Sequence, residues 1–508
     1  MRPRARGTAL AWRTALTIAA VLLLVIGPAA SAPLGDRPSL RRPPGWFDAH
    51  VYHHYSDMTT ELQDLASQHG DSMSLDSIGS SVRGRELWCA RMEDASVEGA
   101  KLDLYYDGGH HGNEYLGTEL GMLLVHHLLE DTDDPLVGEV LSRSVVWVTP
   151  MVNPDGNARD QRDNVNGVDL NRNYPFSFTP GGSHGDSPAS EPETRANVGF
   201  MEGTGLDLYI TGHTGTRALI YPWGDREEAC PDAPMYERFR GIAEAAGVSY
   251  GPSGTTLYIS QGTSEDFAYG ALGSPAFTFE VDGQQTNQIT RREDIAVRLA
   301  DELELTMQLL ASAPLMTANL TVRGVEVPAE ANAGEPTEVR VELENPTYTP
   351  ANNTSVAVHV TQGRELTDSA DAVVDVPEEG CATVVLRVTV PKGGLYDVSV
   401  TVNYPRLLWE NASIGISSYG PVPLEVRGGL FGGGASGGAV VLLLLLLACA
   451  AGAYIAWRRG LLGRLPVIGA LRNRPAKRPR AASAARRMPT SSHRSSMTTS
   501  ASASSSWP

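Results

Sequence analysis

The chain has 508 residues and a formal net charge of −18, from 41 Lys and Arg against 59 Asp and Glu. At roughly 150 residues per domain, this length indicates about three structural units. Four Arg lie in the first 32 residues and 11 Lys or Arg lie in 458–508, so residues 33–457 carry 26 basic against 59 acidic residues. That acidity argues against nucleic acid as a partner, because clustered Lys and Arg neutralise phosphates. With four Cys, a disulfide scaffold and a Cys-built zinc finger are excluded.

The N-terminus carries the pattern of an export signal. Its four arginines precede an apolar run over residues 18–26 and the small-residue triplet Ala30-Ser31-Ala32. This arrangement predicts a secretory signal peptide over residues 1–32, with an uncleaved N-terminal anchor as the alternative.

Residues 46–312 predict an α/β domain. Strand-like runs such as 145–149 and 276–280 alternate there with helical patterns such as 301–310. After Pro314 the pattern changes to short alternating strands separated by Pro, Gly and Asn turns. We therefore predict an Ig-like β-sandwich over residues 315–427, with strands at 338–343, 355–360, 382–390 and 396–402.

The C-terminal part predicts a membrane anchor. Residues 428–438 are rich in Gly and predict a flexible hinge, and residues 439–457 form a 19-residue uncharged apolar run. Such a run can cross the roughly 30 Å hydrocarbon core as a helix. Because Arg458 and Arg459 favour the cytoplasmic side, we expect a single-pass type I protein of the cell membrane with its main body extracellular. Residues 458–508 then form a basic, disordered cytoplasmic tail.

Metal-binding chemistry is concentrated in the α/β segment. A strand-like run over 102–106 leads into the glycine-rich segment DGGHHGNE at 107–114. Within it His111 and Glu114, three residues apart, can direct an imidazole and a carboxylate at one Zn²⁺. The spacing alone is a weak signal, since His127 and Glu130 repeat it in a helical run where an ordinary helix face is expected.

Further motifs follow in a fixed order. They are PMVNPDG at 150–156, RDNVNGVDLNRN at 162–173, LDLYITGH at 206–213, Tyr258, and FTFE at 277–280. In this order, with Tyr258 twenty-two residues before Glu280, the set resembles the zinc carboxypeptidases of the carboxypeptidase A/B type over about residues 48–312. The resemblance implies a mixed-sheet α/β catalytic domain and a metallocarboxypeptidase acting on peptides or proteins with a free C-terminus.

The resemblance assigns the metal and the base. His111, Glu114 and His213 would bind one Zn²⁺ per catalytic domain and leave a fourth position for water. Glu280 would be the general base that takes a proton as water attacks the scissile carbonyl. Asp169 would orient the His111 ring by accepting a hydrogen bond from the ring nitrogen that does not bind the metal.

The resemblance also assigns substrate contacts. Asn171 and Arg172 would hold the C-terminal carboxylate, and Tyr258 would close over the terminal residue. Arg162 would stabilise the developing oxyanion, although loop length leaves Arg159 as an alternative. Glu265, seven residues after Tyr258, would lie at the base of the specificity pocket. A preference for C-terminal Lys or Arg follows if Glu265 faces the pocket rather than solvent.

Alternatives to this function remain. One is a surface protein whose peptidase-like domain binds peptides without catalysis, and another is a zinc hydrolase of cell-wall γ-glutamyl peptides or N-acyl amino acids. Two histidine pairs, His53-His54 and His126-His127, lie in helical stretches and are expected to be ordinary solvated residues.

Overall fold

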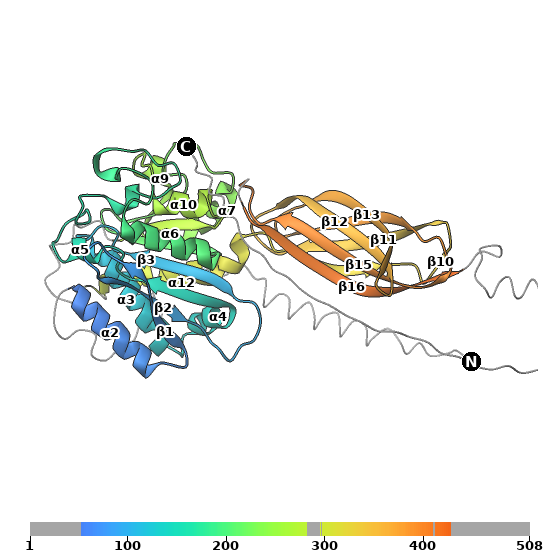
Figure 1. The fold of residues 1–508 in the computed structure, drawn as a ribbon, viewed down its shortest axis with the longest axis horizontal. Helices are drawn as coiled ribbons and strands as arrows, with labels where there is room; N and C mark the ends of the chain where they lie inside the picture. Colours follow the sequence, from blue (N-terminus) through green and yellow to red (C-terminus); the bar gives the residue numbers. More distant parts are fainter. Residues whose placement is uncertain (1–51, 282–294, 296, 410–411, 428–508) are drawn as a thin grey trace, which may run out of the picture. The chain divides into compact units, whose positions relative to one another are not determined.

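A computed structural model describes residues 52–281, 295, 297–409 and 412–427 (Figure 1). The predicted signal peptide, Gly-rich hinge, transmembrane helix and cytoplasmic tail all lie outside the described residues, as do residues 46–51 of the predicted α/β domain. Among the helices in the described ranges, none combines the length and the apolar character needed to cross a bilayer.

The N-terminal part is built on one mixed sheet of eight strands in the order β1-β2-β4-β3-β5-β8-β6-β7. Its centre is parallel, because β3 pairs in parallel with both β4 and β5, and β5 pairs in parallel with β8. The pairs β1/β2, β2/β4 and β6/β8 are antiparallel. The strands are β1 Met73–Ser80, β2 Glu86–Met92, β3 Leu102–Gly108, β4 Ser144–Thr149, β5 Leu208–His213, β6 Ala218–Tyr221, β7 Ser249–Pro252 and β8 Ala276–Glu280.

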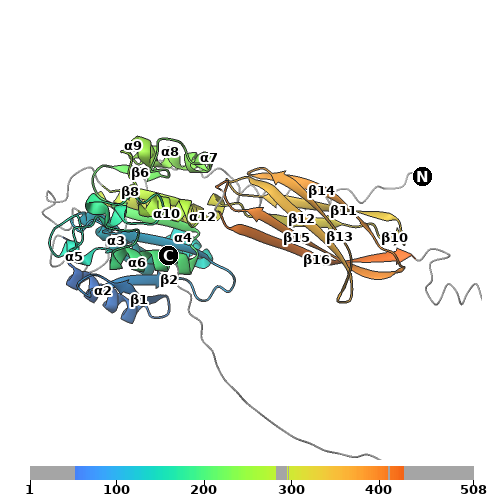
Figure 2. The ribbon, with the colours of Figure 1, turned by 45° about the horizontal axis from the view of Figure 1, so that its top comes forward.

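Helices cover both faces of this sheet, as two neighbouring tyrosines of β3 demonstrate. Successive side chains of a strand point to opposite faces. The Tyr105 hydroxyl donates to Asn197 of α6, whereas the Tyr106 hydroxyl donates to the Gly117 carbonyl of α3. The helices α3 and α6 therefore lie on opposite faces of the sheet, and β3 between them is buried on both sides (Figures 1 and 2).

The helices of the α/β domain vary in length from single turns to the 17 residues of the last helix. They are α2 Tyr55–Gln68, α3 Tyr115–Glu130, α4 Pro135–Arg143, α5 Pro154–Asn157, α6 Pro192–Thr204, α7 Ala233–Tyr236, α8 Arg240–Ala245, α9 Ser253–Thr256, α10 Ser264–Gly270 and α12 Ala300–Met316. Short 3-10 turns occur at η1 Leu170–Arg172, η2 Gly182–His184 and η3 Glu237–Phe239.

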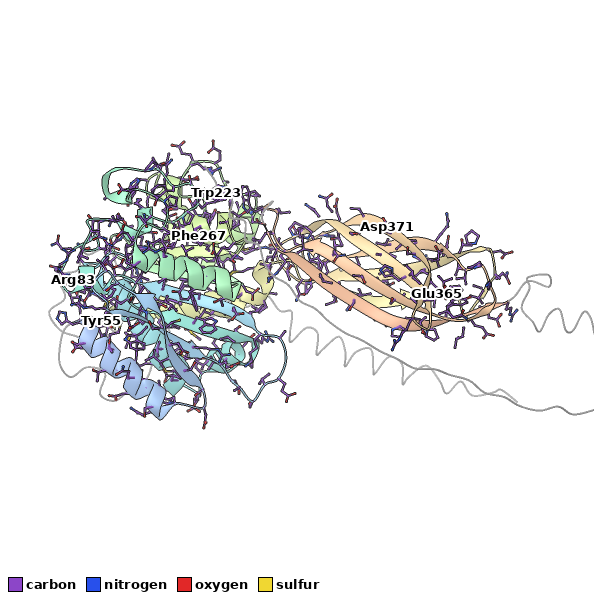
Figure 3. All side chains as sticks on the ribbon, in the orientation of Figure 1. Tyr55, Arg83, Trp223, Phe267, Glu365 and Asp371 are labelled. Atoms are coloured by element: carbon purple, nitrogen blue, oxygen red, sulfur yellow. The ribbon has the colours of Figure 1, made fainter. Side chains whose placement is uncertain are left out.

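A second region with its own hydrophobic core follows α12, and we call it the two-sheet region (residues 321–427). A five-stranded sheet, β10-β16-β15-β12-β13, and a three-stranded sheet, β14-β11-β9, share this core. Figure 2 shows β16, β15, β12 and β13 side by side, and Figure 3 labels the exposed Glu365 and Asp371 of β13. The strands are β9 Thr321–Glu326, β10 Glu330–Asn332, β11 Pro336–Asn345, β12 Ala351–Gln362, β13 Glu365–Val376, β14 Gly380–Thr389, β15 Gly394–Pro405 and β16 Ile414–Arg427.

These elements confirm the predicted mixed α/β fold followed by an additional β-sheet region. Three of the four strands predicted between residues 338 and 402 lie inside observed strands, and the fourth, 382–390, extends one residue beyond β14. The predicted strand at 276–280 coincides with β8.

Candidate metal and peptide site

The site lies where three neighbouring parallel strands end. Gly108 of β3 is in register with Gly212 of β5, and His213 of β5 is in register with Glu280 of β8. The carboxyl ends of parallel strands meet at one edge of a sheet, where ligands of α/β proteins bind. This register brings His213 and Glu280, 67 positions apart in the numbering, to adjacent strand ends.

Glycines make the close approach of these elements possible. A Cβ on Gly117, near the start of α3, would lie 2.2 Å from the Gly212 carbonyl oxygen of β5. Gly109, directly after β3, has a positive φ of 66°, a backbone conformation that residues with a side chain rarely adopt. The loop after β3 can therefore turn sharply and deliver Glu114, the residue before α3, to the strand ends.

Three side chains converge there as a candidate metal site. The ligand atoms of His111, Glu114 and His213 all lie within 4.8 Å of one another. His111 Nδ1 lies 2.8 Å from Glu114 Oε1, and His213 Nδ1 lies 3.1 Å from Glu114 Oε2. The two Nδ1 atoms lie 3.1 Å apart. Two imidazole nitrogens and one carboxylate that point at a common centre fit the donor set of a catalytic zinc site.

A second layer of polar groups orients these ligands. Asp169 accepts a hydrogen bond from His111 Nε2 at 2.9 Å, so that the Nδ1 of this ring is turned toward Glu114. The same carboxylate caps η1 by accepting from the Asn171 backbone N–H at 3.0 Å. Asn171 Nδ2 lies 3.1 Å from His213 Nε2. Asp169 therefore links the metal ligands to the turn that carries Asn171.

Electrostatics at this centre favour a cation. Burial opposes the charged form of His111, but the carboxylates of Glu114 and Asp169 outweigh it and raise the pKa of His111 to about 9. Burial also opposes ionisation of Glu114, yet His111 and His213 hold the pKa of that carboxyl well below its usual range. The two carboxylates thus surround the imidazoles with negative charge, which favours a bound cation.

Glu280 ends β8 beside the ligands and lines the same cavity. Burial raises the pKa of Glu280, and the Glu114 carboxylate adds to the rise, against the opposing influence of His213. A carboxylate whose pKa is raised toward the working pH can accept a proton and release it again. The structure therefore brings the predicted general base to the metal ligands.

Of the two arginines left open by the sequence, Arg162 lies at the site. Its Nη1 donates to Glu114 Oε1 at 2.9 Å, and its Nε donates to Asp169 Oδ2 at 3.0 Å. Arg159 does not line the cavity, and its guanidinium donates to the Asn164 carbonyl at 2.8 Å.

The predicted carboxylate-binding residues line the same cavity as the candidate metal ligands. Arg172 Nη2 donates to the Tyr258 hydroxyl at 3.3 Å, and its guanidinium lies 5.9 Å from the Tyr258 ring centroid. Tyr258 is 58% exposed, so solvent surrounds most of its side chain. Asn171 Oδ1 accepts from the Ser264 backbone N–H at 2.8 Å, which ties η1 to the start of α10.

Glu265 faces the cavity and not the solvent. Its side chain lines the cavity, although the residue is only 2% exposed, and it accepts a hydrogen bond from Thr278 Oγ1. Burial raises the pKa of Glu265, and hydrogen bonds from Thr278 and Ser253 partly oppose that rise. The cavity therefore holds a buried carboxyl group that would gain from a cationic partner.

Sequence reasoning missed several residues of the cavity, whose volume is about 340 Å³. Thr278 could have been found, because it lies two residues before Glu280 on β8 and so shares its face. Ser253 carries no comparable signal, since it reaches the cavity only through the packing of α9. The lining residues not predicted are Thr214, Gly215, Thr216, Ile220, Ser253, Leu257, Ser260, Thr263 and Thr278.

The expectation of solvated histidines is confirmed for His54, which is exposed, and is wrong for His53, His126 and His127. All three residues are at most 6% exposed and are paired with carboxylates. His53 lies between Glu119 of α3 and Glu61 of α2, both at 2.9 Å. For His53 and His126 the helical pattern did not reveal this burial, because it depends on contacts between α2 and α3, such as that of Glu61 with His126.

Comparison with known proteins agrees with the geometry. A sequence profile described as zinc carboxypeptidase matches residues 58–303. The chain contains a zinc carboxypeptidase domain. Zinc is the cofactor of this family, and the carboxypeptidase domain supplies His111, Glu114 and His213 as its candidate ligands.

Individual relatives match the carboxypeptidase domain over part of their length. Carboxypeptidase A6 of Homo sapiens is 28% identical over 275 residues, covering 47% of this chain and 62% of that protein. Carboxypeptidase D of Mus musculus is 31% identical over 203 residues, covering 38% of this chain and 14% of that protein. A solved structure of carboxypeptidase A from Helicoverpa armigera covers 52% of this chain and 74% of its own, with 20% identity and a TM-score of 0.46. The assignment rests on the profile match and not on this last likeness.

Proposed function

We propose that the protein is an extracellular, membrane-anchored metallocarboxypeptidase that hydrolyses the C-terminal peptide bond of peptides or proteins. One observation carries the proposal: the metal ligands, Glu280, Arg162 and the pair Asn171 and Arg172 line a single cavity. Metal-binding, proton-accepting and carboxylate-binding groups are the three kinds of group that such a reaction needs.

The chain's own groups divide the chemistry between them. His111, Glu114 and His213 would hold zinc, which supplies a Lewis acid and lowers the pKa of water when it is bound. The Glu280 carboxylate takes a proton from the water that attacks the scissile carbonyl and returns it to the leaving amine. The guanidinium of Arg162 donates to the negative charge that develops on the scissile carbonyl oxygen.

Recognition of a free C-terminus is assigned to Asn171, Arg172 and Tyr258. The forked donors of a guanidinium match a carboxylate, and Arg172 lines the cavity beside the exposed Tyr258. In this assignment a substrate carboxylate replaces the Tyr258 hydroxyl as the partner of Arg172, and the released ring moves over the terminal residue.

A preference for C-terminal Lys or Arg is proposed from Glu265. Its buried carboxyl group would be stabilised in the ionised form by a cationic side chain, and such a pair in a partly desolvated pocket discriminates against neutral residues. Thr278 and Ser253 hold the carboxyl group toward the pocket.

The cellular arrangement is proposed from the sequence. The signal-like residues 1–32 and the apolar run 439–457 support export and a single-pass type I anchor, and the two-sheet region supports an Ig-like sandwich between enzyme and membrane. Cell-surface proteolysis of the intact protein and of a chain truncated before residue 439 would test the anchor. Release of the truncated chain into the medium is expected, and its retention in the membrane would contradict the proposal.

The activity is tested by amino-acid release from peptides ending in Arg, Lys, Phe or Glu. We expect release by the purified protein that a zinc chelator abolishes, and a loss on the order of 10²–10⁴-fold in the Glu280→Gln variant. The matched control is Glu202→Gln, which changes an exposed glutamate of α6. If folded, zinc-loaded protein releases nothing from any peptide, γ-glutamyl peptides and N-acyl amino acids are the next substrates, and failure there leaves a binding protein.

The basic preference is tested with the Glu265→Gln variant. We expect it to lose most of the discrimination between peptides ending in Arg and in Phe, because the pocket no longer offers a negative charge. A wild-type enzyme that prefers Phe would contradict the assignment of Glu265.

A further inference from the structure

A short segment of the two-sheet region enters the core of the carboxypeptidase domain. Residues 406–409 follow β15, and we call them the 406–409 segment. Leu407 is 1% exposed and belongs to the hydrophobic core of the carboxypeptidase domain, not to that of the two-sheet region. Arg406 Nη2 donates to Asp207 Oδ1 at 2.6 Å. The segment is thus inserted rather than merely adjacent.

A buried carboxylate receives this segment. Asp232, 1% exposed, accepts from the backbone N–H groups of Leu408 at 2.8 Å and Trp409 at 3.2 Å. The Tyr269 hydroxyl donates to the same carboxylate at 2.6 Å. Asp232 takes no part in the chemistry proposed above, and its three donors explain how a carboxylate can be buried there.

Trp409 then contacts the structure that forms the pocket. Its indole Nε1 donates to the Gly270 carbonyl at the end of α10, at 2.9 Å. Its ring lies edge-on to Trp223, with 4.9 Å between the centroids, and Trp223 lies equally close to Tyr269 of α10. Figure 3 labels Trp223 and the α10 residue Phe267. Trp409 therefore supports both α10 and the turn that begins at Trp223.

That turn forms the surroundings of Glu265. The backbone N–H groups of Gly224 and Asp225 donate to Asp266 of α10 at 2.9 and 3.0 Å. A Cβ on Gly224 would lie 2.9 Å from Glu265 Oε1, so the turn and the carboxyl group are in close contact. A shift of this turn would therefore disturb Glu265, the buried carboxyl group that lines the cavity.

From these contacts we propose that Trp409 is a positioning residue for the pocket that takes the side chain of the substrate's terminal residue. The two-sheet region then completes the specificity of the enzyme through the contacts of Trp409 with Trp223 and Gly270. This inference rests on the proposed carboxypeptidase function and concerns only how its pocket is held.

Kinetics of the full chain on peptides that differ only in their last residue test this role. For Trp409→Ala we expect KM for the preferred long residue, Arg or Phe, to rise about tenfold, the scale of losing a small contact in a pocket. KM for peptides ending in Ala should be unchanged, because the methyl side chain is too short to reach Glu265. Trp409→Phe keeps an aromatic ring against Trp223, so its KM should lie between the values of wild type and Trp409→Ala. The matched control Leu395→Ala removes a 65% exposed side chain of β15 and should change neither substrate.

Several outcomes would overturn the inference. One is a folded Trp409→Ala variant whose ratio of KM values for the long-residue and the Ala peptides equals that of wild type. Another is an equal loss of activity on both peptides, because that loss indicates only a smaller amount of folded enzyme. If Trp409→Ala does not fold, the same ratio of KM values measured for Trp409→Phe tests the inference.

Hydrogen exchange supplies a readout that does not need activity. The amides of Gly224 and Asp225 should exchange faster in the Trp409 variants than in wild type and Leu395→Ala, and unchanged exchange would contradict the proposal. If the wild type releases no amino acid from any peptide, the proposed function has failed, and exchange at this turn still shows whether Trp409 positions it.

Discussion

Asp169 illustrates how one side chain can control the site without belonging to its first layer. Its carboxylate contacts the His111 ring, the Arg162 guanidinium and the backbone of Asn171. Burial opposes its ionisation, but His111 and Arg162 hold its pKa well below the usual range. The charge of Asp169 is therefore present at any pH at which the enzyme would work.

We predict that Asp169→Asn lowers zinc affinity by about 10–100-fold, because an amide orients the His111 ring less firmly and makes it less basic. Competition with a chromophoric chelator measures the affinity. The matched control Asp186→Asn, at an exposed position of the loop before α6, should leave it unchanged. Equal affinities in the two variants would show that Asp169 does not orient the ligand.

At the scale of elements, α3 and β5 must touch for the ligands to converge. Glu114 directly precedes α3, His213 ends β5, and the two elements meet at Gly117 and Gly212. The Cβ of an alanine at 117 would lie 2.2 Å from a backbone oxygen that cannot rotate away. The helix and the strand would have to separate, and the two ligands with them.

We predict that Gly117→Ala lowers the free energy of unfolding by about 1–3 kcal/mol, the usual cost of overpacking, and weakens zinc binding as well. Gly138 of α4 is the matched control, since a Cβ there meets no atom within 4 Å. Gly138→Ala should be neutral or stabilise by up to about 1 kcal/mol through helix propensity. Thermal unfolding with and without zinc measures both effects, and a fully stable Gly117→Ala would contradict the contact.

The pair α2 and α3 is joined by a group that responds to pH. Glu61 of α2 contacts His53 Nε2 at 2.9 Å and His126 Nε2 of α3 at 2.6 Å. Burial opposes the ionisation of Glu61, but the hydrogen bonds from His126 and His53 outweigh it and lower the pKa of Glu61 from 4.5 to about 2. A depressed carboxyl pKa stabilises the fold above the unfolded value and loses that contribution as the pH falls through the folded value.

We therefore predict that wild type is more stable than Glu61→Gln above pH 4.5, and that the difference shrinks between pH 4.5 and about 2. Urea unfolding at several pH values measures it. The control is Glu139→Gln, which removes an exposed ion pair with Arg143 on α4. Its free energy of unfolding should differ little from that of wild type at every pH. A Glu61→Gln difference that persists at pH 2 would refute the linkage.

At the scale of the whole molecule, the 406–409 segment joins the two cores. Leu407 lies in the carboxypeptidase core, and Asp232 holds the backbone on its C-terminal side. We expect the two regions to unfold together as long as this anchorage is intact.

We predict that Asp232→Ala lowers the free energy of unfolding by at least about 2 kcal/mol, because it leaves buried N–H and O–H donors without their acceptor. Calorimetry should then resolve two transitions where wild type has one. Glu379→Gln, which weakens an exposed ion pair with Arg238 between the same two regions, should cost less than about 1 kcal/mol. A single, unshifted transition in Asp232→Ala would contradict the proposed coupling.

Strand prediction in the two-sheet region succeeded or failed for identifiable reasons. The strand at 338–343 was found because its inward residues Val339, Val341 and Leu343 are large and apolar. In β16 the pattern is inverted at its start, since Ile414 and Ile416 are exposed and Gly415 faces inward, beneath the Tyr404 ring. Periodicity alone could not recognise β16, because the partner side chain fills the space that an apolar residue would normally occupy.

The sequence by itself supplied the candidate ligands and their order, through motifs that resemble zinc carboxypeptidases, and it predicted the strands that lead to His111 and end at Glu280. His111, Glu114, His213 and Glu280 each follow or end a strand, and this placement is local, so it can be read without knowing what packs against it. Their roles in binding and catalysis remain predictions until the variants are measured.

Only the tertiary structure decided which groups are buried and which distant segments meet. It placed Arg162 rather than Arg159 at the cavity, turned Glu265 inward, buried His53 between two helices and inserted Leu407 into a core formed by residues far from it in the sequence. Burial depends on what covers a side chain, and that is set by contacts between segments whose separation along the chain leaves no periodic trace.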